Sequence, residues 1–188
     1  MQKIPANTAL LIIDVQNGFD APQWGKRNNP NAEDNIVALL TAWREAKRPI
    51  YHVQHMSVLP DSPLRPGQIG NDFKPGAEPF RHEPQFQKTV NSAFIGTDLE
   101  IRLREDEITD LVIVGLTTNH CVSTSTRMAG NLGFNAWLVS DATATFERTA
   151  PDGTHYTAEV LHNVTLANLH GEFATVVDTQ AVLGATYA

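Results

Sequence analysis

The sequence predicts an α/β fold, in which helices cover both faces of a three-layer, doubly wound sheet of about six mainly parallel strands. Short runs of aliphatic and β-branched residues recur along the chain, and their length suits strands that are buried on both faces. Segments with apolar residues at helical spacing lie between these runs. Because strands that alternate with helices are typical of a parallel sheet, the two observations together predict this class.

Most of the expected strands are short apolar runs bounded by polar or turn-forming residues, and the third is a short candidate that contains Lys88. The first ends at Asp14, and the second follows Pro49. The fourth stops at Gly115. The strands are expected at residues 8–13, 50–54, 86–90, 111–114, 136–139 and 173–177.

Four or five helices are expected among these strands. Asn31 is a suitable N-cap for the first helix. The second is expected to begin at Thr97, where the sequence Thr-Asp-Leu-Glu matches a capping box. Two more are expected at 122–132 and 155–169. The buried face of the first contains Ile36, Leu39, Leu40 and Trp43, and that of the last Ala158, Leu161, Val164 and Thr165.

Residues 57–85 form a long loop that departs from this pattern. The loop holds six of the eleven prolines and shows little periodicity. Loops of this length in compact domains tend to have a function, so we expect a lid over a site or an arm between subunits. A linker between two domains is the alternative, but neither flank is a complete fold by itself. We therefore expect one domain that covers residues 1–188.

The composition argues against several classes of function. A net charge of −7 without a cluster of Lys and Arg disfavours nucleic acid as a partner. No apolar run is long enough to span a membrane, and no signal-peptide pattern is present. The single cysteine rules out an intrachain disulfide, so we expect a cytoplasmic protein. We expect a small-molecule substrate, no nucleic-acid or membrane partner, and a homo-oligomer, either a dimer or a tetramer.

Cys121 is the first candidate for a catalytic residue. It follows the strand at 111–114 and a polar turn, and it precedes the helix at 122–132. Free N–H groups at a helix start favour a thiolate and can hold an oxyanion, so this elbow suits a nucleophile with a depressed pKa. A lone cysteine is otherwise most often a small buried hydrophobe. The polar residues around Cys121 favour the reactive role.

Two charged residues are expected to join Cys121. Asp14 ends the first strand and Lys88 lies in the third, and ligands of parallel α/β sheets bind beyond the carboxyl ends of strands. A carboxylate can take the thiol proton, and a neighbouring lysine favours both anions. Taken singly, Asp14 could be a turn former and Lys88 an exposed charge. Their shared placement at one sheet edge favours a catalytic group.

Three motifs give the chain a family resemblance. They are ALLIIDVQNGF with Asp14, KTVNSAF with Lys88, and VIVGLTTNHCVSTSTRMAGNLGF with Cys121, and the segments VSDATAT and LHGEFATVV extend the match. The sequence resembles the isochorismatase-like cysteine hydrolases, which include nicotinamidases, N-carbamoylsarcosine amidases and ureidoacrylate amidohydrolases. The resemblance implies a Rossmann-like sheet with an Asp14, Lys88, Cys121 triad. It also implies a cis peptide between Leu116 and Thr117, and an oxyanion hole formed by the N–H groups of Thr117 and Cys121.

The resemblance implies a hydrolase that cleaves a C–N bond of a small amide, ureide or cyclic imide through a thioester on Cys121. Two alternatives stay open. One is a vinyl ether hydrolase of the isochorismatase type, which does not use the cysteine as a nucleophile. The other is a non-enzymatic redox or binding protein with a peroxide-sensitive thiol.

No cofactor or metal is expected. Nicotinamidases bind a metal after the second strand, but His52 and His55 are three residues apart and should face opposite sides of a strand, which makes them a poor ligand pair. Activity should therefore survive a chelator. Five residues are candidates for substrate binding, although core packing explains the aromatic ones equally well and His120 could pack at the helix start. These are Phe19, Trp24, Phe94, Asn119 and His120.

Overall fold

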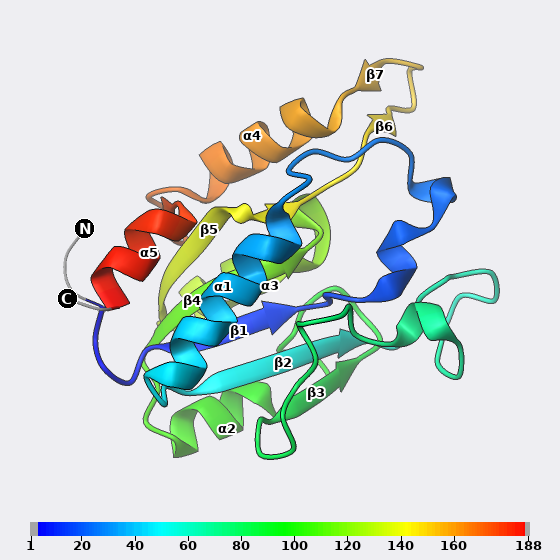
Figure 1. Cartoon of the computed structure of the whole chain (residues 1–188). Coiled ribbons are helices and arrows are strands. Elements are labelled where there is room, and N and C mark those ends of the chain that lie inside the picture. The colour runs from blue at the N-terminus through cyan, green and yellow to red at the C-terminus, as the bar shows by residue number, and fades with distance from the viewer. Residues whose placement is uncertain (1–3, 187–188) are drawn as a thin grey trace.

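The computed structural model describes residues 4–186, which contain one six-stranded parallel sheet with the strand order β3-β2-β1-β4-β5-β8. The chain adds β2 and β3 on one side of β1, and then β4, β5 and β8 on the other side (Figure 1). The sheet is therefore doubly wound, and its switch point lies between β1 and β4. The strands are β1 (Ala9–Ile13), β2 (Ile50–His55), β3 (Gln85–Lys88), β4 (Asp110–Leu116), β5 (Asn135–Ala144) and β8 (Thr175–Val177).

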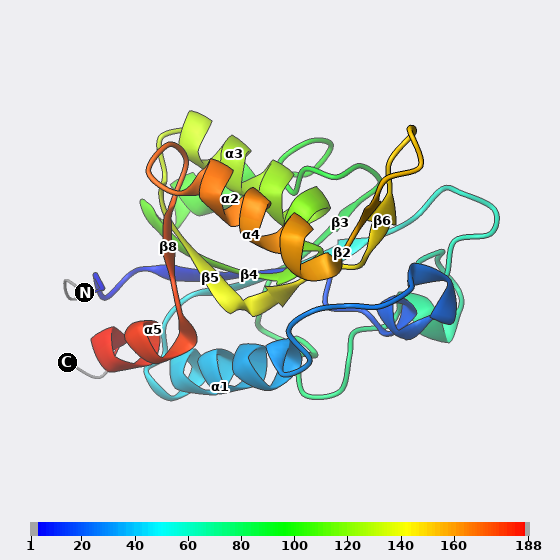
Figure 2. The ribbon, with the colours of Figure 1, turned by 90° about the horizontal axis from the view of Figure 1, so that it is seen from above.

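Five α-helices cover the two faces of the sheet, so the predicted three-layer architecture is confirmed. Figure 2 shows α1 and α5 below the sheet and α2, α3 and α4 above it. A short antiparallel hairpin of β6 (Arg148–Thr149) and β7 (His155–Tyr156) precedes α4. No helix in the described range is long and apolar enough to cross a membrane. The helices are α1 (Ala32–Glu45), α2 (Leu99–Glu105), α3 (Ser123–Asn131), α4 (Ala158–Leu169) and α5 (Thr179–Thr186).

The central strand β1 separates the two halves of the core. Its side chains alternate between faces, as in any strand. Leu11 and Ile13 pack in the cluster that contains residues of α2, α3 and α4, whereas Leu10 and Ile12 pack in the cluster that contains residues of α1 and α5. All five residues of β1 are fully buried, which explains why its sequence is continuously apolar.

Two helical details of the sequence prediction are wrong. Helix α2 begins at Leu99 with Asp98 as its N-cap, and no side chain completes a capping box there. The hydroxyl of Thr97 instead donates to the carbonyl of Ala93. In α4 the buried residues are Ala158, His162 and Leu169, and Val164 is 55% exposed. A polar histidine was not considered for the inner face because the prediction followed apolar periodicity alone.

The long loop is attached to the body of the protein over its second half. The N–H of Lys74 donates to the carbonyl of Val15, and the N–H of Asn17 donates to the carbonyl of Asp72, both at 2.9 Å. The Lys74 side chain forms ion pairs with Asp20 and Glu33. The first half carries exposed apolar side chains, namely Val58, Leu59 and Ile69. Its role as a lid or an arm remains a prediction.

Gly115 allows the two strands at the switch point to approach closely. Its φ of 127° is unfavourable for residues with a side chain. A Cβ at this position would lie 2.0 Å from the carbonyl oxygen of Ile13. Ile13 immediately precedes Asp14, so the absence of a side chain at Gly115 lets β4 lie beside the end of β1.

We predict that Gly115→Ala destabilises the fold by more than about 1 kcal/mol, because the new methyl group meets backbone atoms and the backbone conformation is strained. Gly184→Ala is the matched control, since Gly184 lies in α5 and a Cβ there would meet no atom within 4 Å. Alanine should stabilise that helix slightly. Chemical denaturation of both variants tests this, and equal stabilities would contradict the close approach.

Candidate active site

The structure brings Asp14, Lys88 and Cys121 into direct contact at the carboxyl edge of the sheet. Asp14 directly follows β1, Lys88 is the last residue of β3, and Cys121 lies in the turn after β4. The ammonium Nζ of Lys88 is 2.6 Å from Oδ2 of Asp14 and 3.3 Å from Sγ of Cys121. The expected convergence on one edge is therefore observed, and the ammonium lies between the two acidic groups.

The Lys88–Asp14 pair is shielded from water, because both side chains are 0% exposed. Burial raises the pKa of Asp14 above its usual range, and the charge and hydrogen bond of Lys88 oppose this rise. The second carboxylate oxygen, Oδ1, is buried and has no hydrogen-bond partner within the described part of the chain. A buried carboxylate with a raised pKa and a free lone pair is suited to accept a proton.

The burial of Cys121 argues against the expected thiolate. Burial raises the pKa of this thiol far above its usual value, the negative charge of Asp14 adds to the rise, and Lys88 opposes it. A helix start favours a thiolate, but Cys121 is only 9% exposed, and local sequence does not reveal this burial. Cys121 also lies inside a single π-helical turn, Thr118–Val122, and not at the first residue of a helix. These effects favour the protonated thiol over the thiolate in the resting site.

The turn before Cys121 has the predicted cis peptide between Leu116 and Thr117. The N–H of Thr117 has no hydrogen-bond partner among residues 4–186. The hydroxyl of the next residue, Thr118, is 2.9 Å from Nδ1 of the buried His162 on α4. Helix α4 thus contacts the turn through His162. The N–H of Thr117 is free to donate a hydrogen bond to an oxygen of a ligand.

The structure separates the three aromatic candidates for substrate binding. Phe19 and Trp24 lie 5.4 Å apart between ring centroids and form a cluster with Phe146, which the sequence analysis missed. This cluster includes Leu116, next to the proposed oxyanion hole. Phe94 instead stacks on Phe134, on another part of the core. Phe94 is therefore not part of the cluster that contains Phe19 and Trp24.

Asn119 and His120 lie on the same turn as Cys121, and both are half-buried. The amide oxygen of Asn119 is hydrogen-bonded to the hydroxyl of Thr145. Nδ1 of His120 is 3.1 Å from the hydroxyl of Thr117. Burial, together with the charge of Arg148, lowers the pKa of His120. Both side chains thus have structural partners, and their role in substrate binding remains a prediction.

The two histidines of β2 point to different partners, as their spacing predicts. Nε2 of the buried His52 is 2.8 Å from Glu83, whereas Nδ1 of His55 is 3.1 Å from Nζ of Lys88. His55 was considered only as a partner for His52, so its contact with the lysine was missed. The signal that could have found it is its place at the end of the second strand.

His55 also belongs to a group of potential metal ligands. Its ring nitrogen, a carboxylate oxygen of Asp14 and the thiol of Cys121 all lie within 4.8 Å of one another. The ammonium of Lys88 contacts all three residues and is already a cation among them. A divalent ion would have to displace this ammonium, so the residues present fit a metal poorly. The expectation of metal independence remains a prediction.

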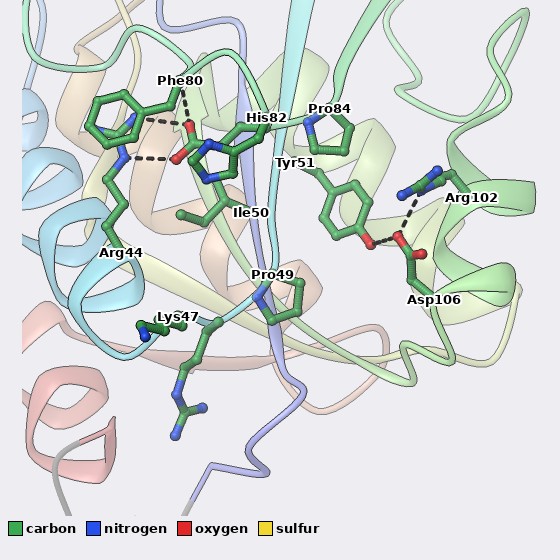
Figure 3. Close-up of a pocket in the computed structure, with 12 residues that line it drawn as sticks. Arg44, Lys47, Pro49, Ile50, Tyr51, Phe80, His82, Pro84, Arg102 and Asp106 are labelled. Carbon is green, nitrogen blue, oxygen red and sulfur yellow. Dashed lines mark hydrogen bonds and ion pairs between the residues drawn. The ribbon is translucent and has the colours of Figure 1, made fainter.

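A surface pocket with a volume of about 510 Å³ lies away from these residues. It opens at the start of β2, around Pro49 and Ile50 (Figure 3). The figure shows Tyr51 directed at Asp106, and Arg44 beside Phe80. Two of its three arginines form ion pairs, Arg44 with Glu83 and Arg102 with Asp106. The triad lies at the opposite end of β2, where ligands of parallel sheets bind.

Comparison with known proteins agrees with the site geometry. A model of the isochorismatase domain matches residues 8–181. The chain belongs to the isochorismatase family. It is 49% identical to the uncharacterized isochorismatase family protein YrdC of Bacillus subtilis, over 93% of this chain and 94% of that protein. It is 28% identical to Nicotinamidase 3 of Arabidopsis thaliana, over 90% of this chain and 84% of that protein.

Solved structures of family members have the same fold. A protein of the isochorismatase family from Chromobacterium violaceum superimposes with a TM-score of 0.96 at 42% identity, covering 100% of this chain and 97% of that one. An isochorismatase from Pseudomonas putida gives a TM-score of 0.88 at 32% identity, covering 97% and 93%. The predicted family and fold are therefore confirmed.

We predict that substitutions of the two charged residues shift the thiol titration in opposite directions. Asp14→Asn should lower the pKa of Cys121, because it removes the negative charge that raises it. Lys88→Met should raise the pKa further, because it removes the opposing cation. Thiolate absorbance measures this cleanly, since Cys121 is the only cysteine. Shifts of the same sign would contradict the arrangement of charges.

Proposed function

We propose that this member of the isochorismatase family is a cysteine-dependent hydrolase that cleaves a C–N bond of a small amide, ureide or cyclic imide. The observation that supports the proposal best is the position of the Lys88 ammonium, 2.6 Å from Asp14 and 3.3 Å from Cys121. A thiol, a carboxylate with a raised pKa and a fixed cation are the groups that covalent acyl transfer needs.

The first half of the reaction forms a thioester. Asp14 accepts the proton of the Cys121 thiol as the sulfur attacks the carbonyl carbon of the substrate. The N–H groups of Thr117 and Cys121 hold the resulting oxyanion, and losing one such donor costs roughly 3 to 4 kcal/mol of transition-state stabilisation. The C–N bond then breaks, and the nitrogen leaves as an amine or ammonia with the proton from Asp14. The acyl group remains on sulfur.

The second half restores the thiol. Asp14, again a carboxylate, takes a proton from water, and the hydroxide oxygen attacks the thioester carbon. The C–S bond breaks, the sulfur recovers the proton from Asp14, and the acid product leaves. The sum is one amide and one water converted into one acid and one amine. Lys88 keeps its positive charge throughout and stabilises whichever neighbour is anionic.

Two relatives favour C–N chemistry over the vinyl ether alternative. One is Nicotinamidase 3, and the other is the Streptothricin hydrolase of Streptomyces noursei, which is 29% identical over 77% of this chain and 52% of its own length. The thiol of Cys121, 3.3 Å from Lys88, also has no evident use in a reaction that needs no nucleophile. The substrate itself has to be found by a screen of amides, ureides and cyclic imides for ammonia release.

We predict that Cys121→Ala lowers ammonia release from an accepted amide by more than about a thousandfold, because no other residue replaces the nucleophile. Asp14→Asn should also remove most of the turnover, since an amide cannot accept the thiol proton. Asp61→Asn is the control, because Asp61 is an exposed carboxylate in the long loop. Unchanged turnover by Cys121→Ala would favour the vinyl ether class of hydrolase.

A further outcome separates the remaining alternative. If no amide, ureide or imide is hydrolysed and Cys121 is reversibly oxidised by peroxide to a sulfenic acid, a redox or binding role is favoured. Intact mass measurement distinguishes the two, because a thioester adds the mass of the acyl group and a sulfenic acid adds one oxygen.

A further inference from the structure

We propose that His55 is a positioning residue of this site, which holds the ammonium of Lys88 between Asp14 and Cys121. The inference rests on the proposed function for its use in catalysis, but the contact itself is a property of the fold. His55 was not among the residues singled out for catalysis, and it acts through Lys88 and not on the reacting atoms.

The sheet order makes this contact unavoidable. Strand β2 lies between β3, which ends at Lys88, and β1, which leads into Asp14. His55 is the last residue of β2 and is the direct register partner of Lys88. Residues paired in this way on neighbouring parallel strands direct their side chains to the same face. The ring of His55 is therefore placed beside the lysine side chain by the register alone.

The hydrogen bonds assign one tautomer to His55. A lysine ammonium has three N–H donors and no acceptor. Nζ of Lys88 contacts Asp14 at 2.6 Å, His55 Nδ1 at 3.1 Å and Cys121 Sγ at 3.3 Å, which accounts for all three donors. Nδ1 must then accept, so the ring is neutral with its proton on Nε2. The backbone of Val90 favours a ring N–H, whereas burial and Lys88 disfavour the charged ring.

The backbone of His55 is held from two sides. Its N–H donates to Oε1 of Gln16 at 2.9 Å, and its carbonyl accepts from Nε2 of Gln16 at 3.1 Å. The same carbonyl accepts from Nδ2 of Asn71, in the long loop, at 2.8 Å. Gln16 and Asn71 are both buried. The imidazole is thus a fixed acceptor, whereas a water molecule in its place would be free to move.

The contact has a consequence for the thiol. Lys88 favours the thiolate of Cys121 only while its ammonium stays close to the sulfur. Without an acceptor at the position of Nδ1, one N–H loses its partner and the ammonium can turn away from the sulfur. Loss of the acceptor should therefore make the thiol harder to ionise, even though His55 does not touch the substrate.

The test compares His55→Leu with His55→Asn by the pH dependence of Cys121 alkylation with iodoacetamide. Asparagine places its amide oxygen near the position of Nδ1, whereas leucine offers no acceptor. The leucine variant should move the alkylation profile up by roughly one pH unit, which is about tenfold slower alkylation at a fixed pH below the midpoint. The asparagine variant should stay close to the wild-type profile. Identical profiles for wild type and the folded leucine variant would overturn the proposal.

A second comparison covers the case in which His55→Leu does not fold, as judged by circular dichroism. His55→Gln carries the same amide as His55→Asn, but one carbon further out, near the position of Nε2 and beyond reach of Lys88. The glutamine variant should show the shift and the asparagine variant should not. Equal shifts in both would overturn the proposal. Alkylation requires no hydrolysis, so these outcomes are independent of whether an amide substrate is found.

Discussion

The buried ion pair between Lys88 and Asp14 is the interaction on which the rest of the site depends. Neither side chain is exposed, and removing one partner of such a pair typically costs about 3 to 5 kcal/mol because the other charge is left without compensation. Three acceptors surround the ammonium, and they come from the residue after β1, from the end of β2 and from the turn after β4. The lysine lies at the end of the edge strand β3, and its three acceptors follow or end the next strands of the sheet, β2, β1 and β4.

The same burial determines how the thiol behaves. Burial disfavours an anion on the sulfur of Cys121, and the nearby carboxylate of Asp14 disfavours it further, so both effects favour a protonated thiol before the sulfur attacks. A thiol protected in this way is less open to alkylation and oxidation by chance encounters. Reactivity then depends on Asp14, whose raised pKa makes it a better proton acceptor than an exposed aspartate. Proton transfer to Asp14 and attack by the sulfur are therefore coupled, because a free thiolate is unfavourable in this buried site.

Much of the fold could be predicted because each buried strand is a short apolar run and each helix an amphipathic segment. Asp14, Lys88 and Cys121 could be placed at one edge because each lies at or near the end of such a strand. What depends on three-dimensional packing could not be predicted. The low exposure of Cys121 reversed the expected direction of its pKa. Local periodicity does not show the register that pairs His55 with Lys88. It also does not show that the polar residue His162 lies on the inner face of α4.

The central claim is that the resting site holds a protonated thiol beside a buried ion pair. Infrared spectroscopy tests this most directly, because the S–H stretch absorbs where other protein groups do not and Cys121 is the only cysteine. A protonated thiol should give an S–H band at neutral pH that is absent in Cys121→Ala and that disappears only at strongly alkaline pH. A native protein without this band at neutral pH, and with thiolate absorbance in its place, would contradict the account.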